Sequence, residues 1–414
     1  MVFNKDKYMK FKIICGKSTI QIGNEELQQK LKKDLATNTH LSVFLGSGCS
    51  TKAIPLMGTT FEKFKKESEK ENNTCFNDIY KKFCSKNPKN KSNIESFLSW
   101  IGSGIKYSFD PQLKDIKDKL TSLLIESVKA PFDDYGLVKE TQDENSEEIK
   151  KTKDLYNKFI KSLSVIKSNS NDRFDIINVF TTNYDLFIER ALDDLGFSYT
   201  DGFNRGLAYK FDVSEYSKRP VDTHNRFKDH WSTISPFFRV YKLHGSINWI
   251  GHKVSENKTE FIKTPNISNK QDEVLIAPTS SKYAETQGSP YSDLFRELSV
   301  KLLMPNSILL LNGFSFGDEH INELISQSLS RPDFKLIAFV DEKNDVTKDF
   351  IDRVGGNSRA IFITDGDKNQ NSEHAYYFST LVDLLDSNNL FDSENQYDPK
   401  EKDESVPESK NDKN

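Results

Sequence analysis

The chain has 414 residues, long enough for one large domain or two ordinary ones, and 58 Lys and Arg against 62 Asp and Glu give a net charge of −4. This balance excludes the global positive charge that is typical of nucleic-acid-binding proteins, although a local basic groove stays compatible with it, so direct nucleic-acid binding is left open. Apolar residues make up 36% of the chain, and no apolar stretch has the length of a membrane span or the pattern of a signal peptide, so we expect a cytoplasmic protein with no membrane contact.

Short apolar runs rich in β-branched residues recur along the chain. They are nearly continuous rather than alternating, which predicts strands buried on both faces, as in a parallel sheet. These runs are 41–45, 176–180, 239–243, 274–277, 307–311, 335–340 and 360–364. Helical patterns separate several of them, at 185–195, 318–329 and 375–385. The alternation predicts an α/β fold, a Rossmann-like doubly wound parallel sheet.

The segment between the first two predicted strands has helical periodicity and no strand pattern. We therefore predict that 56–169 form a helical subdomain inserted into a sheet domain made of 1–55 and 170–386. The last stretch, 387–414, is dominated by Asp, Glu, Lys, Ser and Asn. Such a composition has almost nothing to bury, so we expect a disordered tail.

The first predicted strand runs directly into Gly46-Ser47-Gly48. Glycines at such a turn let backbone N–H groups approach a phosphate, and the start of a following helix would add its dipole. The dinucleotide-binding fingerprint requires a third glycine at the position of Thr51, which weakens this interpretation. A phosphate-binding loop and a plain tight turn both remain open.

The second predicted strand ends at two threonines, an asparagine and an aspartate. Thr182 and Asp185 have the spacing of a capping box, and either Thr182 or Asn183 could cap the helix that follows. Residues at the carboxyl end of a parallel strand also face the crevice in which doubly wound sheets bind ligands. We expect Thr182 to cap the helix while Asn183 and Asp185 face a ligand.

Three later strands end in a similar way. His244 and Gly245 follow one of them, Gly313 and Ser315 another, and Asp341 a third. A lone histidine is more often structural than catalytic. Because the carboxyl ends of parallel strands lie at one edge of a sheet, the five strand ends together predict a ligand site there.

The motifs, in this order, resemble those of the Sir2 family. The segment 46–50, GSGCS, resembles G-A-G-x-S, and 181–185, TTNYD, matches T-Q-N-I-D in three of five places. His244-Gly245 matches H-G, and 313–315, GFS, resembles G-T-S. The resemblance covers roughly 40–55 and 175–345 and leaves the helical segment unexplained.

In that family the matching positions bind and cleave NAD. The resemblance implies that the 46–50 loop holds the pyrophosphate, that Asn183 and Asp185 lie beside the nicotinamide and its ribose, and that His244 is the base. It assigns catalysis to Asn183, Asp185 and His244. The residues implied to bind the nucleotide are Gly46, Ser47, Gly48, Cys49, Ser50, Thr182, Gly245, Gly313, Ser315 and Asp341.

The sequence departs from the protein deacylases of the family in two ways. Those enzymes carry a four-cysteine zinc module after H-G, whereas here no cysteine follows Cys84 and no C-x-x-C pair occurs. They also carry G-I-P-x-F-R after the first loop, whereas residues 53–58, AIPLMG, lack the Phe-Arg pair. The chain looks more like the zinc-free prokaryotic Sir2-like proteins of antiphage defence, which destroy NAD, and we expect no zinc ribbon and no metal.

This resemblance favours an NAD glycohydrolase that acts in abortive infection. Because such an enzyme would be toxic if unregulated, the resemblance also implies a sensor acting in trans, a HerA-type helicase/ATPase partner, and a homo-oligomer. One alternative is an NAD-dependent protein deacylase or ADP-ribosyltransferase. Another is a non-catalytic subunit that senses a nucleotide or binds nucleic acid.

Overall fold

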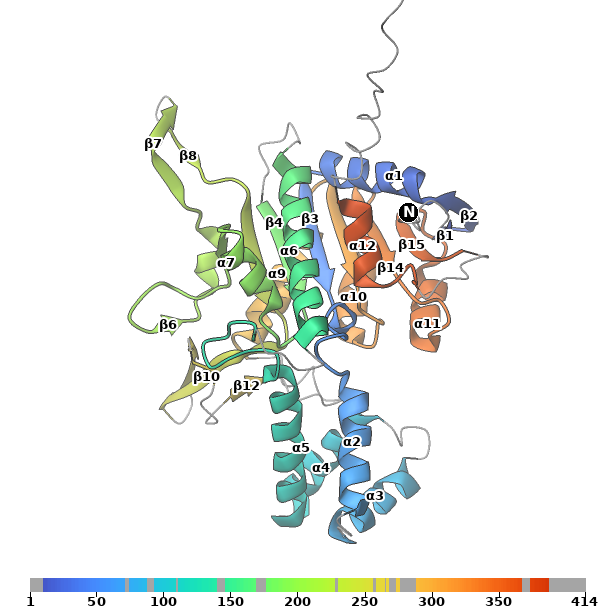
Figure 1. The fold of residues 1–414 in the computed structure, drawn as a ribbon, viewed down its shortest axis with the longest axis vertical. Helices are drawn as coiled ribbons and strands as arrows, with labels where there is room; N and C mark the ends of the chain where they lie inside the picture. The colour runs from blue at the N-terminus through green and yellow to red at the C-terminus, as the bar shows by residue number, and fades with distance from the viewer. Residues whose placement is uncertain are drawn as a thin grey trace, which may run out of the picture.

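The computed structural model describes twelve stretches of the chain (Figure 1). They are 10–70, 74–87, 93–108, 111–139, 146–168, 176–227, 230–255, 258–264, 266–267, 273–275, 288–366 and 373–386. The tail predicted to be disordered, 387–414, lies outside these residues.

Within the described residues, a nine-stranded sheet with the order β2-β1-β15-β14-β13-β3-β4-β9-β5 forms the centre of the molecule (Figure 1). The strands from β15 to β5 are parallel, and the edge strands β1 and β2 are antiparallel. The parallel strands are β3 (His40–Leu45), β4 (Ile176–Thr181), β5 (Ser198–Thr200), β9 (Phe237–Lys242), β13 (Ser307–Asn312), β14 (Phe334–Phe339) and β15 (Ala360–Asp365). The edge strands are β1 (Lys10–Cys15) and β2 (Ser18–Gly23).

The order of the strands reverses direction between β3 and β13. From β3 the chain moves to β4 and β9 on one side, then returns to β13 on the other side and continues to β14 and β15. This is a doubly wound arrangement, and the predicted Rossmann-like α/β fold is confirmed. In such sheets ligands bind beyond the carboxyl ends of the strands at the reversal, here those of β3 and β13.

Both faces of the sheet are buried, and the continuous apolar runs of the strands supply side chains to the core on each face. In β13, Ile308 and Leu310 join one core, and Leu309 and Leu311 join the core on the opposite face. Side chains alternate between faces along a strand, so only an unbroken apolar run can supply two cores. The first core contains residues of α1 (Asn24–Thr37), α6 (Ser146–Ser168), α7 (Phe187–Asp194) and α12 (Phe378–Leu385). The second contains residues of α9 (Tyr291–Leu302), α10 (Glu319–Ser328) and α11 (Asp345–Val354).

Four helices below the sheet in Figure 1 share a separate core. They are α2 (Met57–Lys70), α3 (Thr74–Lys86), α4 (Ile94–Ser108) and α5 (Pro111–Lys129), and we call them the helical unit. Of the segment 56–169 that was predicted as an insert, α6 does not share this core. Instead Tyr156, Phe159 and Leu163 of α6 pack in the first core of the sheet.

A smaller antiparallel sheet lies beyond β9 and consists of β6 (Tyr209–Lys210), β10 (Gly245–Ser255), β11 (Lys258–Lys263) and β12 (Glu273–Leu275). A separate two-stranded sheet, the hairpin of β7 (Val221–Phe227) and β8 (His230–Thr233), lies at the upper left of Figure 1. The 3-10 helix η3 (Val213–Ser217) precedes it in the chain. The run 274–277 was predicted as a buried parallel strand, and this prediction is wrong. Its described part is in β12, which pairs antiparallel with β10, because an apolar run does not specify the direction of its partner strand.

None of the helices in the described stretches is both long enough and apolar enough to cross a membrane.

We predict that Phe97→Ala loosens the helical unit without unfolding the central sheet. Phe97 is fully buried, and its ring centroid lies 5.3 Å from that of Phe61 and 5.2 Å from that of Phe83. Truncating such a ring costs about 3–5 kcal/mol. Hydrogen exchange should show lost protection in α2–α5 while β3 and β13 stay protected. An equal loss of protection in the strands would show that the two cores unfold as one.

Candidate active site

The loops that follow β3 and β13 touch each other at the reversal point of the sheet. The backbone N–H of Gly46 donates to the Asn312 carbonyl (2.9 Å), and that of Gly48 donates to the Gly313 carbonyl (2.8 Å). A Cβ on Gly46 would overlap the Gly313 carbonyl, and a Cβ on Gly48 would lie 2.6 Å from the Gly313 Cα. Gly313 itself has a φ of +70°, which favours glycine. These glycines are therefore required for the close approach of two loops.

The segment after β3 is a three-residue 3-10 helix, η2 (Ser47–Cys49), and the next α-helix begins only at Met57. Ser47 is exposed, whereas Cys49 and Ser50 are buried. The expected helix dipole is thus limited to one short turn. The close contact with the loop after β13 is enough to explain why this turn contains glycines. Phosphate binding by the 46–50 loop stays a prediction.

Asn183 and Asp185 are buried beneath this loop. The Asn183 Nδ2 donates to the Gly46 carbonyl (3.1 Å) and to the Ser50 Oγ (3.3 Å), and the Ser50 Oγ donates to the Asp185 Oδ2 (2.9 Å). The hydroxyl of Tyr156, from α6, lies 2.9 Å from the same Ser50 Oγ. The structure therefore joins the ends of β3 and β4 through side-chain hydrogen bonds. Tyr156 was missed because its place in a helical pattern indicates only a core residue.

The helix after β4 is not capped by Thr182, and that prediction is wrong. Helix α7 begins at Phe187, whose N–H donates to the Asp185 Oδ1 (3.1 Å). The chain bends between strand and helix, so Thr182 lies too far from the first turn. Its neighbour Thr181 accepts from the Asn183 N–H (3.0 Å) and donates to the Leu45 carbonyl (2.7 Å), which fixes the direction of the segment.

The charge of Asp185 is balanced by a buried lysine. Burial raises the pKa of the Asp185 carboxyl, and Lys242 opposes this shift. The ammonium of Lys242 donates to the Asp185 carbonyl and lies 3.1 Å from the Glu189 Oε1, and the lysine side chain is only 1% exposed. Burial and the nearby Asp185 raise the pKa of the Cys49 thiol well above its ordinary value, so Cys49 is a neutral thiol in this site.

His244 is buried beside a carboxylate that the sequence had indicated only as the start of a helix. Its Nε2 lies 3.2 Å from the Asp318 Oδ2, and the Asp318 Oδ1 accepts from the backbone N–H of His320 (3.1 Å) at the start of α10. An ionised carboxylate only accepts hydrogen bonds, so with Asp318 ionised the proton of this contact lies on the His244 Nε2. No signal in the sequence links Asp318 to His244.

The segments that carry Asn183 and His244 run side by side. In the β4–β9 pairing Thr181 is opposite Lys242, and the Leu243 N–H donates to the Thr181 carbonyl (2.9 Å). Gly245, with a φ of +88°, turns the chain into β10 directly after His244. Asn183 and His244 therefore lie at equivalent positions beyond neighbouring strands.

The other predicted residues lie on the β13–β14 side of the reversal point. Ser315 is exposed, and its carbonyl accepts from the Thr347 hydroxyl (3.3 Å). The Asp341 carboxylate accepts from the Lys343 N–H (3.0 Å). Burial, reinforced by Asp341, raises the pKa of Tyr376 to about 12. Ser315 and Asp341 lie at the same edge of the sheet as Asn183, but they follow β13 and β14, on the opposite side of β3 from β4.

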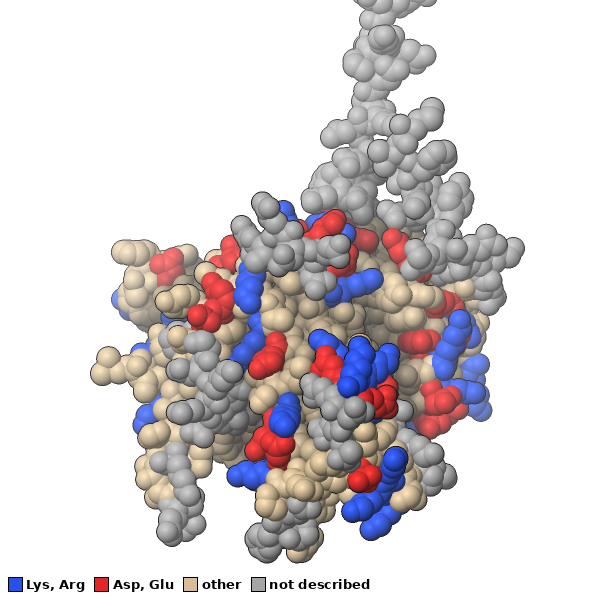
Figure 2. Space-filling view, turned by 60° about the horizontal axis from the view of Figure 1, so that its bottom comes forward, with Lys and Arg blue, Asp and Glu red and all other residues tan. Residues whose placement is uncertain are grey.

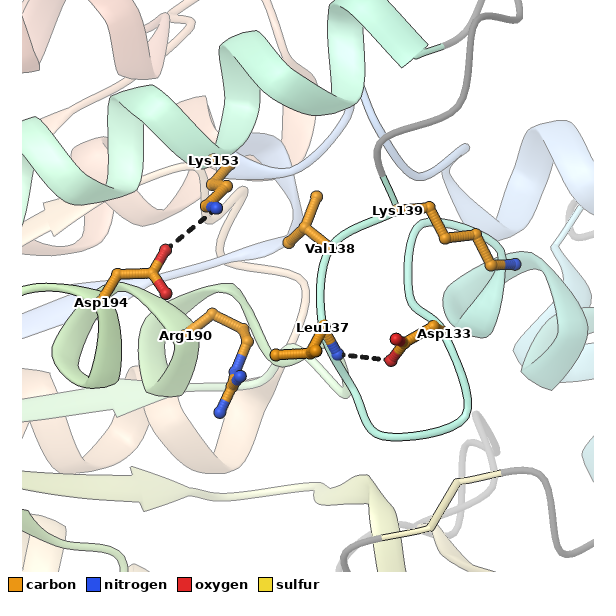
Figure 3. Close-up of a pocket in the computed structure, with 7 residues that line it drawn as sticks. All are labelled: Asp133, Leu137, Val138, Lys139, Lys153, Arg190 and Asp194. Carbon is orange, nitrogen blue, oxygen red and sulfur yellow. Dashed lines mark hydrogen bonds and ion pairs between the residues drawn. The ribbon is translucent and has the colours of Figure 1, made fainter.

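A cavity of about 430 Å³ opens elsewhere, between α6, α7 and the loop that follows α5 (Figure 3). Its walls are Asp133, Leu137, Val138, Lys139, Lys153, Arg190 and Asp194. Lys153 and Asp194 pair across the two helices (3.1 Å). The lining includes none of the predicted site residues, so the cavity is not the predicted crevice.

Among the described residues there is no group of three or more His, Cys, Asp or Glu side chains that could hold a metal ion.

In a comparison with known families, residues 177–357 match the model of the SIR2-like domain. This range contains Asn183, Asp185, His244 and Asp318, and the loop at Gly46 precedes it. A search of curated proteins finds no match to the chain. The matched range is less than half of the chain.

We predict that Gly46→Ala destabilises the protein by about 1–3 kcal/mol, because the added methyl group must push the two loops apart. The matched control is Gly102→Ala in α4, where an added Cβ meets nothing within 4 Å. That substitution should raise stability by up to about 1 kcal/mol, since alanine favours helix. Denaturant unfolding measures both. Equal effects of the two substitutions would contradict the close approach of the loops.

Proposed function

We propose that this protein is an NAD glycohydrolase, which converts NAD and water to nicotinamide and ADP-ribose. The observation that carries the proposal is the hydrogen-bonded junction of the 46–50 loop with Asn183 and Asp185 at the reversal point of the sheet, with His244 beyond the neighbouring strand. Doubly wound sheets bind ligands at this position. The match of 177–357 to the SIR2-like domain supports NAD as the substrate.

The hydrogen bonds of Asn183 support a polar substrate here. Its Nδ2 is occupied by the Gly46 carbonyl and the Ser50 Oγ, whereas its buried Oδ1 has no hydrogen-bond partner among the described atoms. A buried acceptor without a partner costs about 1–3 kcal/mol. A donor on the substrate, such as the nicotinamide amide or the attacking water, would satisfy it.

The chemistry follows from the charge that develops on the ribose. When the bond between the ribose C1′ and the nicotinamide nitrogen breaks, both electrons leave with nicotinamide, and the ribose becomes positive as in glycoside hydrolysis. The Asp185 carboxylate stabilises this charge, and Asn183 positions the water. The His244 Nδ1 accepts the proton of the water as its oxygen bonds to C1′.

Asp318 supports His244 in this scheme. With its Oδ2 3.2 Å from Nε2, Asp318 fixes the tautomer of the imidazole and stabilises the imidazolium that forms when Nδ1 is protonated. The same carboxylate accepts N–H bonds at the start of α10, so its position is set by the helix.

We extend the proposal to the cell: the activity is the effector of an abortive-infection antiphage defence system in the cytoplasm. Uncontrolled hydrolysis of NAD would harm the host, so a sensor must control it. We propose a HerA-type helicase/ATPase as this partner, and a homo-oligomer assembled through the helical unit. The resemblance of the sequence motifs and the presence of a separate four-helix core support this extension.

We predict that Asn183→Ala and His244→Ala each reduce NAD cleavage at least about 100-fold, the usual contribution of a positioned catalytic group. Chromatography of nicotinamide and ADP-ribose measures the loss, with and without the protein encoded next to this one. The control is Ile20→Ala, an exposed position on the edge strand β2. NAD left intact by the wild type in both conditions would refute the hydrolase. Release that requires an acylated or acceptor protein would instead indicate a deacylase or ADP-ribosyltransferase.

We predict that Asp185→Asn abolishes cleavage but raises the thermal midpoint at neutral pH. Burial raises the pKa of Asp185, so its ionised form is less stable in the folded than in the unfolded chain. The folded state therefore loses stability as the pH rises from the ordinary carboxyl pKa of the unfolded chain through the raised pKa of the folded chain. Lys242 keeps its contacts with Glu189 and the backbone carbonyl.

Calorimetry of both proteins between about pH 4 and pH 8 tests this sign, because the variants should converge at the acid end, where Asp185 is protonated. A variant that is less stable than the wild type at neutral pH would contradict it.

A further inference from the structure

Tyr156 contributes a buried hydroxyl to the site from outside every motif of the sequence. Tyr156 lies on α6 and is 0% exposed, and its hydroxyl oxygen lies 2.9 Å from the Ser50 Oγ. Its ring stacks on that of Phe187 (centroids 5.4 Å apart, planes at 12°). A buried phenol that is hydrogen-bonded to the proposed catalytic network calls for a chemical role.

The donors and acceptors of the network determine the direction of each hydrogen bond. The Ser50 hydroxyl has one proton and two lone pairs. The proton goes to the Asp185 Oδ2, and the Asn183 Nδ2, which can only donate, uses one lone pair. Tyr156 must therefore donate to the second lone pair. Ser50 is then saturated, and all bonds point toward an ionised Asp185.

Protonation of Asp185 on Oδ2, the oxygen that accepts from Ser50, would reverse this direction. The carboxylic acid would donate to Ser50, so Ser50 would have to turn its own proton toward Tyr156. The phenol proton would then lose its acceptor in a fully buried place, which costs free energy. The network thus favours the carboxylate over the acid.

We propose that Tyr156 is a positioning residue for the reaction: by donating to Ser50 it directs the Ser50 proton to Asp185 and holds that carboxylate ionised and oriented. Its catalytic consequence rests on the proposed NAD hydrolysis, whereas its effect on Asp185 does not. The helix α6 acts on both oxygens, because Tyr156 reaches Oδ2 through Ser50 and stacks on Phe187, whose N–H donates to Oδ1.

Three titratable groups interact with Asp185 from the elements packed around it, namely Lys242 on β9, Cys49 in η2 and Tyr156 on α6. A fourth, Glu189 on α7, contacts Lys242. Cys49 and Tyr156 are both buried neutral groups, since burial raises the pKa of each well above neutrality. Lys242 and Glu189 pair with each other, so removal of the Tyr156 hydroxyl changes one donor and no charge.

The test is Tyr156→Phe in the full-length chain, read by the ¹³C carboxyl titration of Asp185 and by NAD kinetics. Removing one donor from the chain of hydrogen bonds should raise the Asp185 midpoint by about half to one pH unit, the worth of a typical hydrogen bond. The acid limb of the kcat profile should move by the same amount. We expect kcat at neutral pH to fall about tenfold and KM to stay within about twofold.

The matched control is Tyr216→Phe. Tyr216 is equally buried and donates to the Val240 carbonyl (3.0 Å), in the core on the other face of the sheet. This variant should lose similar stability and leave the Asp185 midpoint unchanged. In a Ser50→Ala background, Tyr156→Phe should add no further shift, because its effect passes through Ser50.

Two outcomes would overturn the assignment: an unchanged Asp185 midpoint in Tyr156→Phe, or a further shift of the Asp185 midpoint when Tyr156→Phe is added to Ser50→Ala. A wild type that fails to cleave NAD would refute the proposed function alone, since the carboxyl titration requires no turnover. If the Asp185 midpoint shifts in Tyr156→Phe and the wild type cleaves NAD, both the role of Tyr156 and the proposed function are supported.

Discussion

A buried carboxylate at the end of a parallel strand is the constraint on which this site depends. Asp185 is buried away from water, so the protein itself must supply the hydrogen-bond donors that stabilise the charge of its carboxylate. The Ser50 hydroxyl and the Phe187 N–H supply two of these donors, and the ammonium of Lys242 donates to the backbone carbonyl of Asp185. Because those donors come from the loop after β3, from α7 and from β9, the position of one carboxylate ties three parts of the fold together. The pKa of Asp185 is still raised by burial, so the site retains a cost that a substrate with positive charge can offset.

The helical unit reaches this carboxylate through the loop that connects α5 to α6. In that loop Phe132 lies 5.0 Å from Phe187, ring to ring, and a Cβ on Gly136 would come within 2.8 Å of the Leu186 side chain. Leu186 and Phe187 directly follow Asp185. A shift of the helical unit would therefore press on the two residues next to Asp185, which would give the proposed partner a physical route to the candidate site. Figure 2 shows Lys and Arg interspersed with Asp and Glu on the face seen from the helical end, so no single sign of charge dominates there.

The sequence predicts the sheet well because parallel strands require unbroken apolar runs, and six of the seven runs are central strands of the structure. It also places Asn183 and His244 at strand ends, since a polar residue after such a run can only lie at that edge. It does not predict Tyr156 or Asp318, because contacts between distant segments leave no local pattern: a tyrosine in a helix indicates core, and an aspartate before a helix indicates a cap. The prediction of a cap at Thr182 failed because the chain bends after β4 and α7 begins only at Phe187, whose N–H donates to the Asp185 Oδ1.

The most direct measurement of the central claim is a single turnover of NAD in ¹⁸O-labelled water with mass analysis of the products. Attack by a water held between Asn183 and His244 predicts free nicotinamide and ADP-ribose that carries one ¹⁸O atom at C1′. ADP-ribose attached to protein, an unlabelled cyclic product, or the absence of nicotinamide release would contradict hydrolysis at this site.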